Sequence, residues 1–152
     1  GLGDIFALIF FGPVAVAGTY YVQGLTLNIL PIVAGLGPGF FSVAILTVNN
    51  LRDIEGDRTS GKKTLAVRFG ARFAQVEYVA ALLAGCLGVP LTLFFLSGGH
   101  FHALLGAVTL FFSIQPIRVV LQGPGPQLNP VLGTTGKLLL LFSLLFSVGW
   151  NL

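Results

Sequence analysis

Five apolar segments follow one another along the chain, and each is long enough to cross a lipid bilayer. About 20 helical residues span the hydrocarbon core. Lipid offers no hydrogen-bond partner to backbone amides, so each segment is predicted to be a helix. The predicted spans cover residues 5–22, 25–48, 76–96, 101–121 and 131–150. The pattern therefore predicts an all-α, polytopic transmembrane helix bundle with five spans in a single domain.

Composition supports a membrane protein. The chain is 55% hydrophobic and only 9% charged, whereas soluble domains carry roughly a quarter charged residues. The net charge of +3 is too small to imply a nucleic-acid partner. The single cysteine, Cys86, excludes a disulfide framework and a cysteine metal cluster. Because the 152 residues include no methionine, we expect the chain to be an internal or processed piece of a longer protein.

The eight basic residues are predicted to lie on one side of the membrane. Six of them fall in the segment 49–75 between the second and third spans, Arg118 lies near the end of span four, and Lys137 lies near the start of span five. If the spans alternate in direction, all these positions share one side, which the positive-inside rule makes cytoplasmic. Arg118 and Lys137 can extend to the interface or face inward at a site, and both interpretations stay open.

The segment 49–75 also carries candidate chemistry. Asn49, Asp53 and Asp57 are four residues apart, so on a helix that continues out of the second span they share one face. Two stacked carboxylates repel each other unless a hard cation such as Mg²⁺ lies between them, and Mg²⁺ is commonly held by one or two carboxylates plus phosphate oxygens. Cations that can pair with the phosphate charge lie beside them: Arg52, Arg58, Lys62 and Lys63. The alternative is a solvated loop whose positive charges only set the orientation.

The segment NNLRDIEGDRTSGKKTLAVRFG, residues 49–70, resembles the second aspartate-rich motif of the UbiA-type intramembrane aromatic prenyltransferases. Within that superfamily it is most similar to the 1,4-dihydroxy-2-naphthoate polyprenyltransferases of menaquinone synthesis. Two flanking stretches, residues 10–23 and 128–150, are similar to the same branch. The resemblance implies a nine-helix bundle around a cavity that opens sideways into lipid, of which this chain forms the C-terminal five helices. The N-terminal half of the same protein, with an N-D-x-x-D motif, would complete it.

The resemblance also implies roles for individual residues. Asp53 and Asp57 would be the catalytic, metal-holding carboxylates, with Asn49 as a third ligand of Mg²⁺. Three cations would bind the diphosphate of a polyprenyl diphosphate: Lys62, Arg58 and Arg52. The reaction implied is prenyl transfer to 1,4-dihydroxy-2-naphthoate, giving demethylmenaquinone with release of diphosphate and carbon dioxide. The 152-residue piece alone is expected to be inactive without the N-terminal half.

Two alternatives to this function remain. One is a UbiA-type enzyme that uses a different aromatic acceptor. The other is part of a transporter-type membrane bundle. Transporters usually place ionisable residues deep within their spans, but here only Arg118 and Lys137 are expected to lie within spans, with no acidic residue in mid-membrane.

Overall fold

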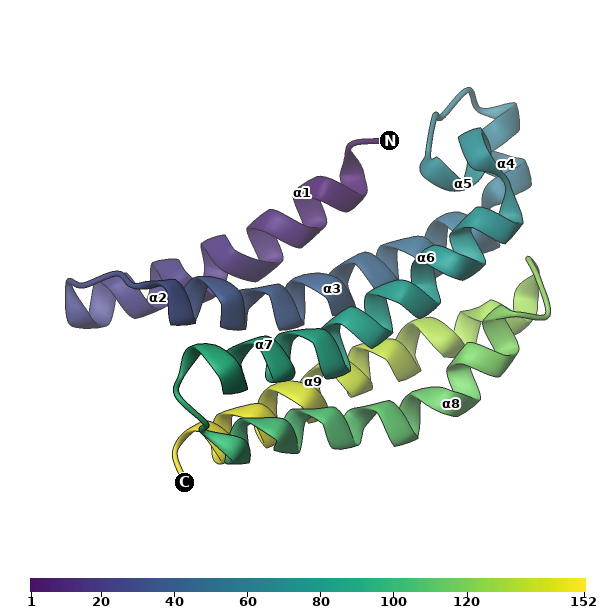
Figure 1. Cartoon of the computed structure of the whole chain (residues 1–152). Helices are drawn as coiled ribbons and strands as arrows, with labels where there is room; N and C mark the ends of the chain where they lie inside the picture. The colour runs from purple at the N-terminus through teal and green to yellow at the C-terminus, as the bar shows by residue number, and fades with distance from the viewer.

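The computed structural model describes all 152 residues, which form helices and connecting turns without any strand. The chain runs back and forth as long helices packed side by side (Figure 1). In chain order the elements are α1 Gly3–Ile9, η1 Phe10–Val14, α2 Ala15–Gly24, α3 Ile29–Arg52, α4 Ile54–Thr59, α5 Leu65–Phe69, α6 Ala71–Leu83, η2 Ala84–Gly88, α7 Val89–Leu96, η3 Phe101–Val108, α8 Thr109–Val120, η4 Pro126–Leu128 and α9 Asn129–Trp150.

Five continuous helical stretches are long and apolar enough to cross a membrane, so the predicted all-α fold with five spans is confirmed. They are Gly3–Gly24, Ile29–Arg52, Ala71–Leu96, Phe101–Val120 and Pro126–Trp150. Short π-helical segments interrupt the first and third stretches at η1 and η2. Pro13 lies within η1, next to Gly12, whose backbone leaves the helical region (φ −107°, ψ −110°). A proline removes one backbone donor and crowds the preceding turn, which accounts for the kink in the first stretch.

The segment expected as a loop, residues 49–75, is mostly helical. The second span continues through Arg52, and α4 and α5 occupy much of the connection before α6 begins at Ala71. Thr64 caps α5 by accepting a hydrogen bond from the Val67 N–H at 3.2 Å. Gly70 then takes a positive φ of 88°, a conformation open to glycine, and turns the chain into α6. Two short helices, of which α5 is capped by Thr64, thus form most of the connection between α3 and α6.

Glycines bring the first span into close contact with α3. A Cβ atom built on Gly35 would lie 2.7 Å from the Pro13 Cα, and one built on Gly39 would lie 2.6 Å from the Leu8 carbonyl oxygen. Such distances leave no room for a side chain, so glycine is required at both positions. Small residues at helix crossings are the usual means by which helices approach closely in a membrane, where lipid supplies no hydrophobic driving force.

The core lies around α3, which contacts the first span, α6 and α9. Phe41 on α3 and Phe142 on α9 are almost fully buried, and their ring centroids are 5.2 Å apart. Tyr78 on α6 is also fully buried, and its hydroxyl lies 3.0 Å from the Thr135 hydroxyl on α9. The buried phenol thereby keeps a hydrogen-bond partner. These contacts join the middle of α9 to α3 and to α6.

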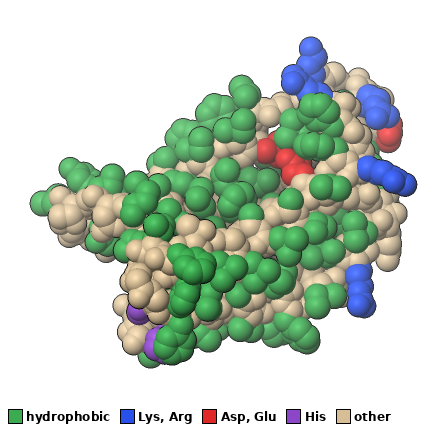
Figure 2. Space-filling model, viewed as in Figure 1, with side chains coloured by type: hydrophobic (Ala, Val, Ile, Leu, Met, Phe, Trp, Pro, Cys, Tyr) green, Lys and Arg blue, Asp and Glu red, His purple; other side chains and the backbone are tan.

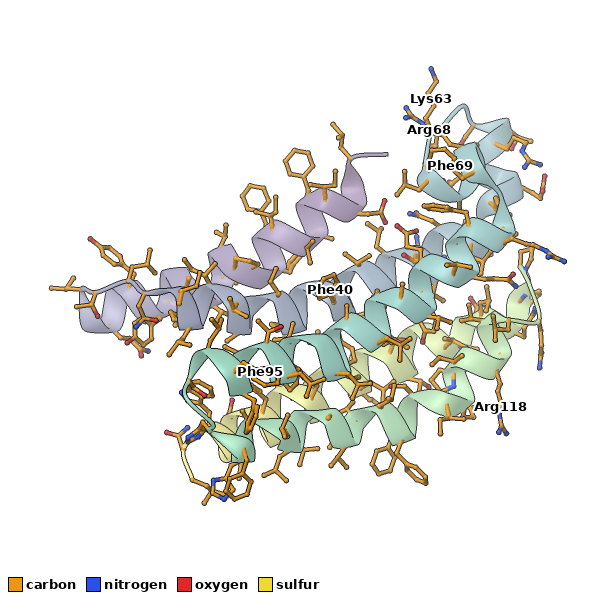
Figure 3. All side chains as sticks on the ribbon, in the orientation of Figure 1. Phe40, Lys63, Arg68, Phe69, Phe95 and Arg118 are labelled. Carbon is orange, nitrogen blue, oxygen red and sulfur yellow. The ribbon has the colours of Figure 1, made fainter.

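The two ends of the bundle differ in charge. In the space-filling view, Lys and Arg side chains gather at the end where α4 and α5 lie, and the His side chains lie at the opposite end (Figure 2). Lys63, Arg68 and Phe69 project outward from the connection, and Arg118 points away from α8 at the same end of the bundle (Figure 3). The outward direction of Arg118 favours extension to the interface over an inward role.

Candidate functional site

Four oxygen atoms converge on the guanidinium group of Arg52. Its Nε and Nη2 donate to the two carboxylate oxygens of Asp53, at 2.7 and 2.6 Å. Nη2 also donates to the Asn49 Oδ1 at 2.9 Å, and Nη1 donates to the Asn129 Oδ1 at 3.2 Å. The two-pronged contact with Asp53 matches the planar fork of an arginine to a carboxylate. We call these four residues the Arg52 cluster.

The end of α3 positions three members of this cluster. Asn49 and Arg52 are three residues apart on the last turn of α3, so their side chains meet on one face. The helix ends at Arg52, and Asp53 takes a non-helical backbone conformation (φ −96°, ψ 11°) before α4 begins. The expectation of one continuous helix from Asn49 to Asp57 is therefore wrong. A break at Asp53 redirects its carboxylate toward the neighbouring guanidinium.

Asp57 and Lys62 form a second pair beside the cluster. Asp57 is 5% exposed, and its Oδ1 accepts a hydrogen bond from the Lys62 Nζ at 2.9 Å. The Lys62 backbone N–H also donates to the Asp57 carbonyl oxygen at 3.0 Å, which closes the loop after α4. Gly61, with a φ of 75°, permits this turn. A short local loop thus holds the cation against a buried carboxylate.

The charges of the two pairs influence each other. The hydrogen bond from Arg52 is the main reason that the pKa of Asp53 is lowered, and the charge of Lys62 adds to the effect. The hydrogen bond to Asp57 is the main cause of a raised pKa of Lys62, and the charge of Asp53 contributes. Lys62 therefore lies within electrostatic reach of both aspartates.

Arg58, predicted to bind diphosphate, lies apart from both pairs. Its Nη1 donates to the two carboxylate oxygens of Glu55, each at 3.0 Å, and both side chains are largely exposed. The two residues are three apart on α4, which brings them together on its outer surface. To reach a diphosphate beside Asp53, Arg58 would first have to leave Glu55.

Asn129 is the member of the site that sequence reasoning missed. It is separated from Arg52 by 77 residues and begins α9, so only the fold brings it to the cluster. Its position is fixed by Leu128, which is fully buried in the core. The stretch from Leu128 to Trp150 resembles the prenyltransferases, but nothing in its spacing relative to Asp53 identifies Asn129 as a partner of Arg52.

An apolar cavity adjoins the Arg52 cluster. It has a volume of about 580 Å³, lies between the first span and α3, and touches α9 at Leu132. Asn49 belongs both to its lining and to the cluster. The other lining residues are Gly3, Phe6, Ala7, Phe10, Phe11, Ser42, Ile45 and Leu46. One cavity thus joins a hydrocarbon surface to a group of charged and amide side chains.

The sequence profile of the UbiA prenyltransferase family matches residues 1–127. The chain belongs to this family. The match includes both aspartates, Arg52 and Lys62, whereas Asn129 lies just beyond it. With five helices able to cross a bilayer, this UbiA chain is an integral membrane protein.

Several proteins of the UbiA family are similar over nearly the whole chain. The 1,4-dihydroxy-2-naphthoate octaprenyltransferase of Escherichia coli is 41% identical, covering 98% of this chain and 48% of the relative. The protein of the same name from Mycobacterium leprae is 37% identical, covering 95% of this chain and 48% of the relative. UbiA prenyltransferase domain-containing protein 1 of Mus musculus is 34% identical, covering 97% of this chain and 42% of the relative. The chain spans about half the length of the curated relatives it matches. No solved structure is significantly similar to it.

The oxygen atoms of this UbiA chain fit a hard divalent cation in their chemistry. Asn49, Asp53 and Asp57 offer carboxylate and amide oxygens, the ligands that Mg²⁺ prefers. Asn49 and Asp53 accept hydrogen bonds from Arg52, and Asp57 accepts one from Lys62, so a cationic group already lies against each of the three side chains. No group of three or more His, Cys, Asp or Glu side chains is placed to hold a metal. This chain by itself therefore offers a partial set of ligands.

Two further acidic residues lie on spanning helices. Asp4 on α1 is 6% exposed, and its Oδ1 has no hydrogen-bond partner. Glu77, the seventh residue of α6, lies within electrostatic reach of Asp4. Figure 2 shows an acidic patch in a hollow, apart from the Lys and Arg side chains at the end of the bundle. The expectation that only Arg118 and Lys137 would lie within spans is therefore wrong, because Asp4 and Glu77 lie on spanning helices and the packing of α1 against α3 buries the carboxyl group of Asp4.

Proposed function

We propose that the protein containing this chain transfers a polyprenyl group from polyprenyl diphosphate to 1,4-dihydroxy-2-naphthoate in a Mg²⁺-dependent reaction. The observation that carries this proposal is the position of Asn49, which lies at once in the Arg52 cluster and in the wall of the apolar cavity. A substrate with a charged head and a hydrocarbon tail suits such a junction. The names of the bacterial relatives support the dihydroxynaphthoate acceptor.

The residues at the charged end would hold the diphosphate in two ways, through bound Mg²⁺ and through direct hydrogen bonds. Asp53, Asp57 and Asn49 would hold Mg²⁺, and Lys62 and Arg52 would donate hydrogen bonds to diphosphate oxygens. Arg58 would join them only after leaving Glu55. Bound Mg²⁺ would supply positive charge against the diphosphate as its bond to carbon weakens. Lys62 and Arg52 would stabilise the same developing negative charge from fixed positions, which is the kind of help that often dominates catalysis.

The apolar cavity would serve the organic part of the reaction. When the carbon–oxygen bond breaks, the diphosphate leaves with the bonding electrons and an allylic cation remains. Phe6 and Phe10 line the cavity, with ring centroids 5.8 Å apart, and their faces can stabilise a cation and exclude water. The electron-rich ring of the acceptor would then form the new carbon–carbon bond and lose its carboxyl group as carbon dioxide.

The charged end would face the cytoplasm, in the cell's inner or plasma membrane. The Lys and Arg side chains that gather at this end support the assignment through the positive-inside rule. The cytoplasmic face is also where a water-soluble naphthoate could reach the cluster without crossing the membrane. The partners of the chain would be the prenyl donor, the aromatic acceptor, the bilayer and the other half of the same protein.

The test is prenyl transfer by the full-length protein in lipid vesicles, with product measured by mass spectrometry. We expect demethylmenaquinone to form from dihydroxynaphthoate with Mg²⁺ and not after chelation with EDTA. Asp53→Ala and Asp57→Ala should each abolish the product while the helix content measured by circular dichroism is retained. The matched control is Glu55→Gln, which removes a carboxylate from the same short segment but not from either pair, and it should retain activity.

Unchanged turnover in both aspartate variants would reject the assignment of the metal ligands. Efficient transfer to a single-ring hydroxybenzoate, with none to dihydroxynaphthoate, would retain the prenyltransferase and reject the acceptor. Absence of transfer to any aromatic acceptor would reject the enzyme.

A further inference from the structure

We propose that Asn129 is a positioning residue that holds the Arg52 guanidinium at the diphosphate site when the metal is bound. This inference rests on the proposed function and assigns a role to a residue outside the aspartate-rich segment. The inference depends on which hydrogen bonds of Arg52 remain when the other oxygens of the Arg52 cluster coordinate the metal.

Arg52 makes four hydrogen bonds, and three of them go to proposed metal ligands. Two are to Asp53 and one is to Asn49. An oxygen that coordinates a divalent cation is a poorer partner for a guanidinium group, since the two positive charges repel each other. Metal binding would therefore weaken or break these three bonds.

The fourth hydrogen bond is the one that remains. Nη1 of Arg52 donates to the Asn129 Oδ1 at 3.2 Å, and Asn129 is not one of the three proposed metal ligands. With Nη1 tethered, Nε and Nη2 are released from Asp53 and Asn49 and can donate to diphosphate oxygens instead. Two donors on a planar guanidinium suit phosphate oxygens well.

The backbone at Asn129 is held in place by the core, which suits a residue that positions Arg52. Leu128, the preceding residue, is fully buried, and α9 begins at Asn129 with Pro130 in its first turn. The anchor is thus fixed to the core of the bundle and not to the short helices that carry Asp57 and Lys62. Without the hydrogen bond to Asn129, the long and partly exposed Arg52 side chain would be free to move. Each binding of diphosphate would then cost the conformational entropy of ordering it.

The test uses the full-length protein with inorganic pyrophosphate as the probe, in the presence of saturating Mg²⁺. We expect Asn129→Ala to weaken pyrophosphate binding about twofold to tenfold, the range for one net hydrogen bond. Asn129→Ser should give the same loss, because its hydroxyl is too short to reach Arg52. The matched control is Gln127→Ala, since the Gln127 amide donates only to carbonyls of its own loop; this variant should bind as the native protein does.

A double-mutant cycle separates positioning from a structural role. If Asn129 acts through Arg52, Asn129→Ala should have no further effect on pyrophosphate affinity in an Arg52→Gln protein. Mn²⁺ affinity without pyrophosphate can be followed by the electron paramagnetic resonance signal of free Mn²⁺. In Asn129→Ala it should stay within about twofold of the native value, well below the loss of about 10–100-fold that follows when a metal ligand loses its own hydrogen-bond partner.

Three results would overturn the inference alone: native affinity in Asn129→Ala, additive losses in the cycle, or Mn²⁺ affinity that falls in parallel with pyrophosphate affinity. The last result would make Asn129 a metal ligand or a structural residue. If the native protein shows no Mg²⁺-dependent binding of pyrophosphate, the proposed function fails as well.

Discussion

The close crossing of the first span and α3 predicts a large difference between two Gly→Ala substitutions. A Cβ on Gly39 would lie 2.6 Å from the Leu8 carbonyl oxygen and 3.1 Å from the Gly12 Cα, whereas a Cβ on Gly136 in α9 would have no neighbour within 4 Å. Both changes replace glycine within a helix, so both should gain about 1 kcal/mol of helix propensity. Only Gly39→Ala also overpacks a helix contact.

The magnitude follows from these distances. Ordinary contacts begin near 3.4 Å, so the two helices would have to separate by about 0.8 Å at Gly39 (3.4 minus 2.6). The obstructing atoms belong to the backbone and cannot rotate away. Overpacking of this kind costs about 1–3 kcal/mol. Since the propensity gain cancels between the variants, Gly39→Ala should be about 1–3 kcal/mol less stable than Gly136→Ala.

The assay is reversible unfolding of the full-length protein in mixed detergent micelles, monitored by circular dichroism. Gly35→Ala, whose Cβ would lie 2.7 Å from the Pro13 Cα, should behave like Gly39→Ala. Equal free energies of unfolding for Gly39→Ala and Gly136→Ala would refute the reasoning, because they would mean that the helices are not in contact at this crossing.

Two further predictions concern the core and the charged end. Phe142→Ala should lower the free energy of unfolding by about 3–5 kcal/mol, since Phe142 is 1% exposed and packs on Phe41. The control is Phe95→Ala, at a side chain that is 75% exposed and projects from α7 (Figure 3), and it should change the free energy of unfolding by less than about 0.5 kcal/mol. Similar losses in the two variants would contradict the packing. The lowered pKa of Asp53 means that its bond to Arg52 stabilises the fold fully above the unfolded pKa of about 3.9 and ceases to do so as the pH falls through the folded pKa. The difference in melting temperature between the native protein and Asp53→Asn should therefore be constant from pH 5 to about pH 9 and vanish in acid. A difference that persists unchanged in strong acid would show that the Asp53–Arg52 pair does not stabilise the fold.

Much of this protein was readable from local sequence. The five spans follow from apolar run length, because lipid leaves a backbone no choice but to satisfy its own hydrogen bonds. The contact of Asn49, Arg52 and Asp53 lies within five consecutive residues, and the Asp57–Lys62 pair closes a short loop. Family membership could be recognised from the same stretch, and the family profile confirms it.

Tertiary structure decided the features that join distant segments. Asn129 reaches Arg52 across 77 residues, and the cavity takes its walls from the first span, α3 and α9. The carboxyl group of Asp4 is buried only because α1 packs against α3. The need for glycine at Gly35 and Gly39 likewise arises only where the first span crosses α3. A hydrophobic run predicts a helix in the membrane. Because every face of that helix is apolar, the run does not predict which face contacts which neighbouring helix. That choice depends on the shapes of the packed surfaces, and it is what places an anchor, a cavity and a charged cluster together.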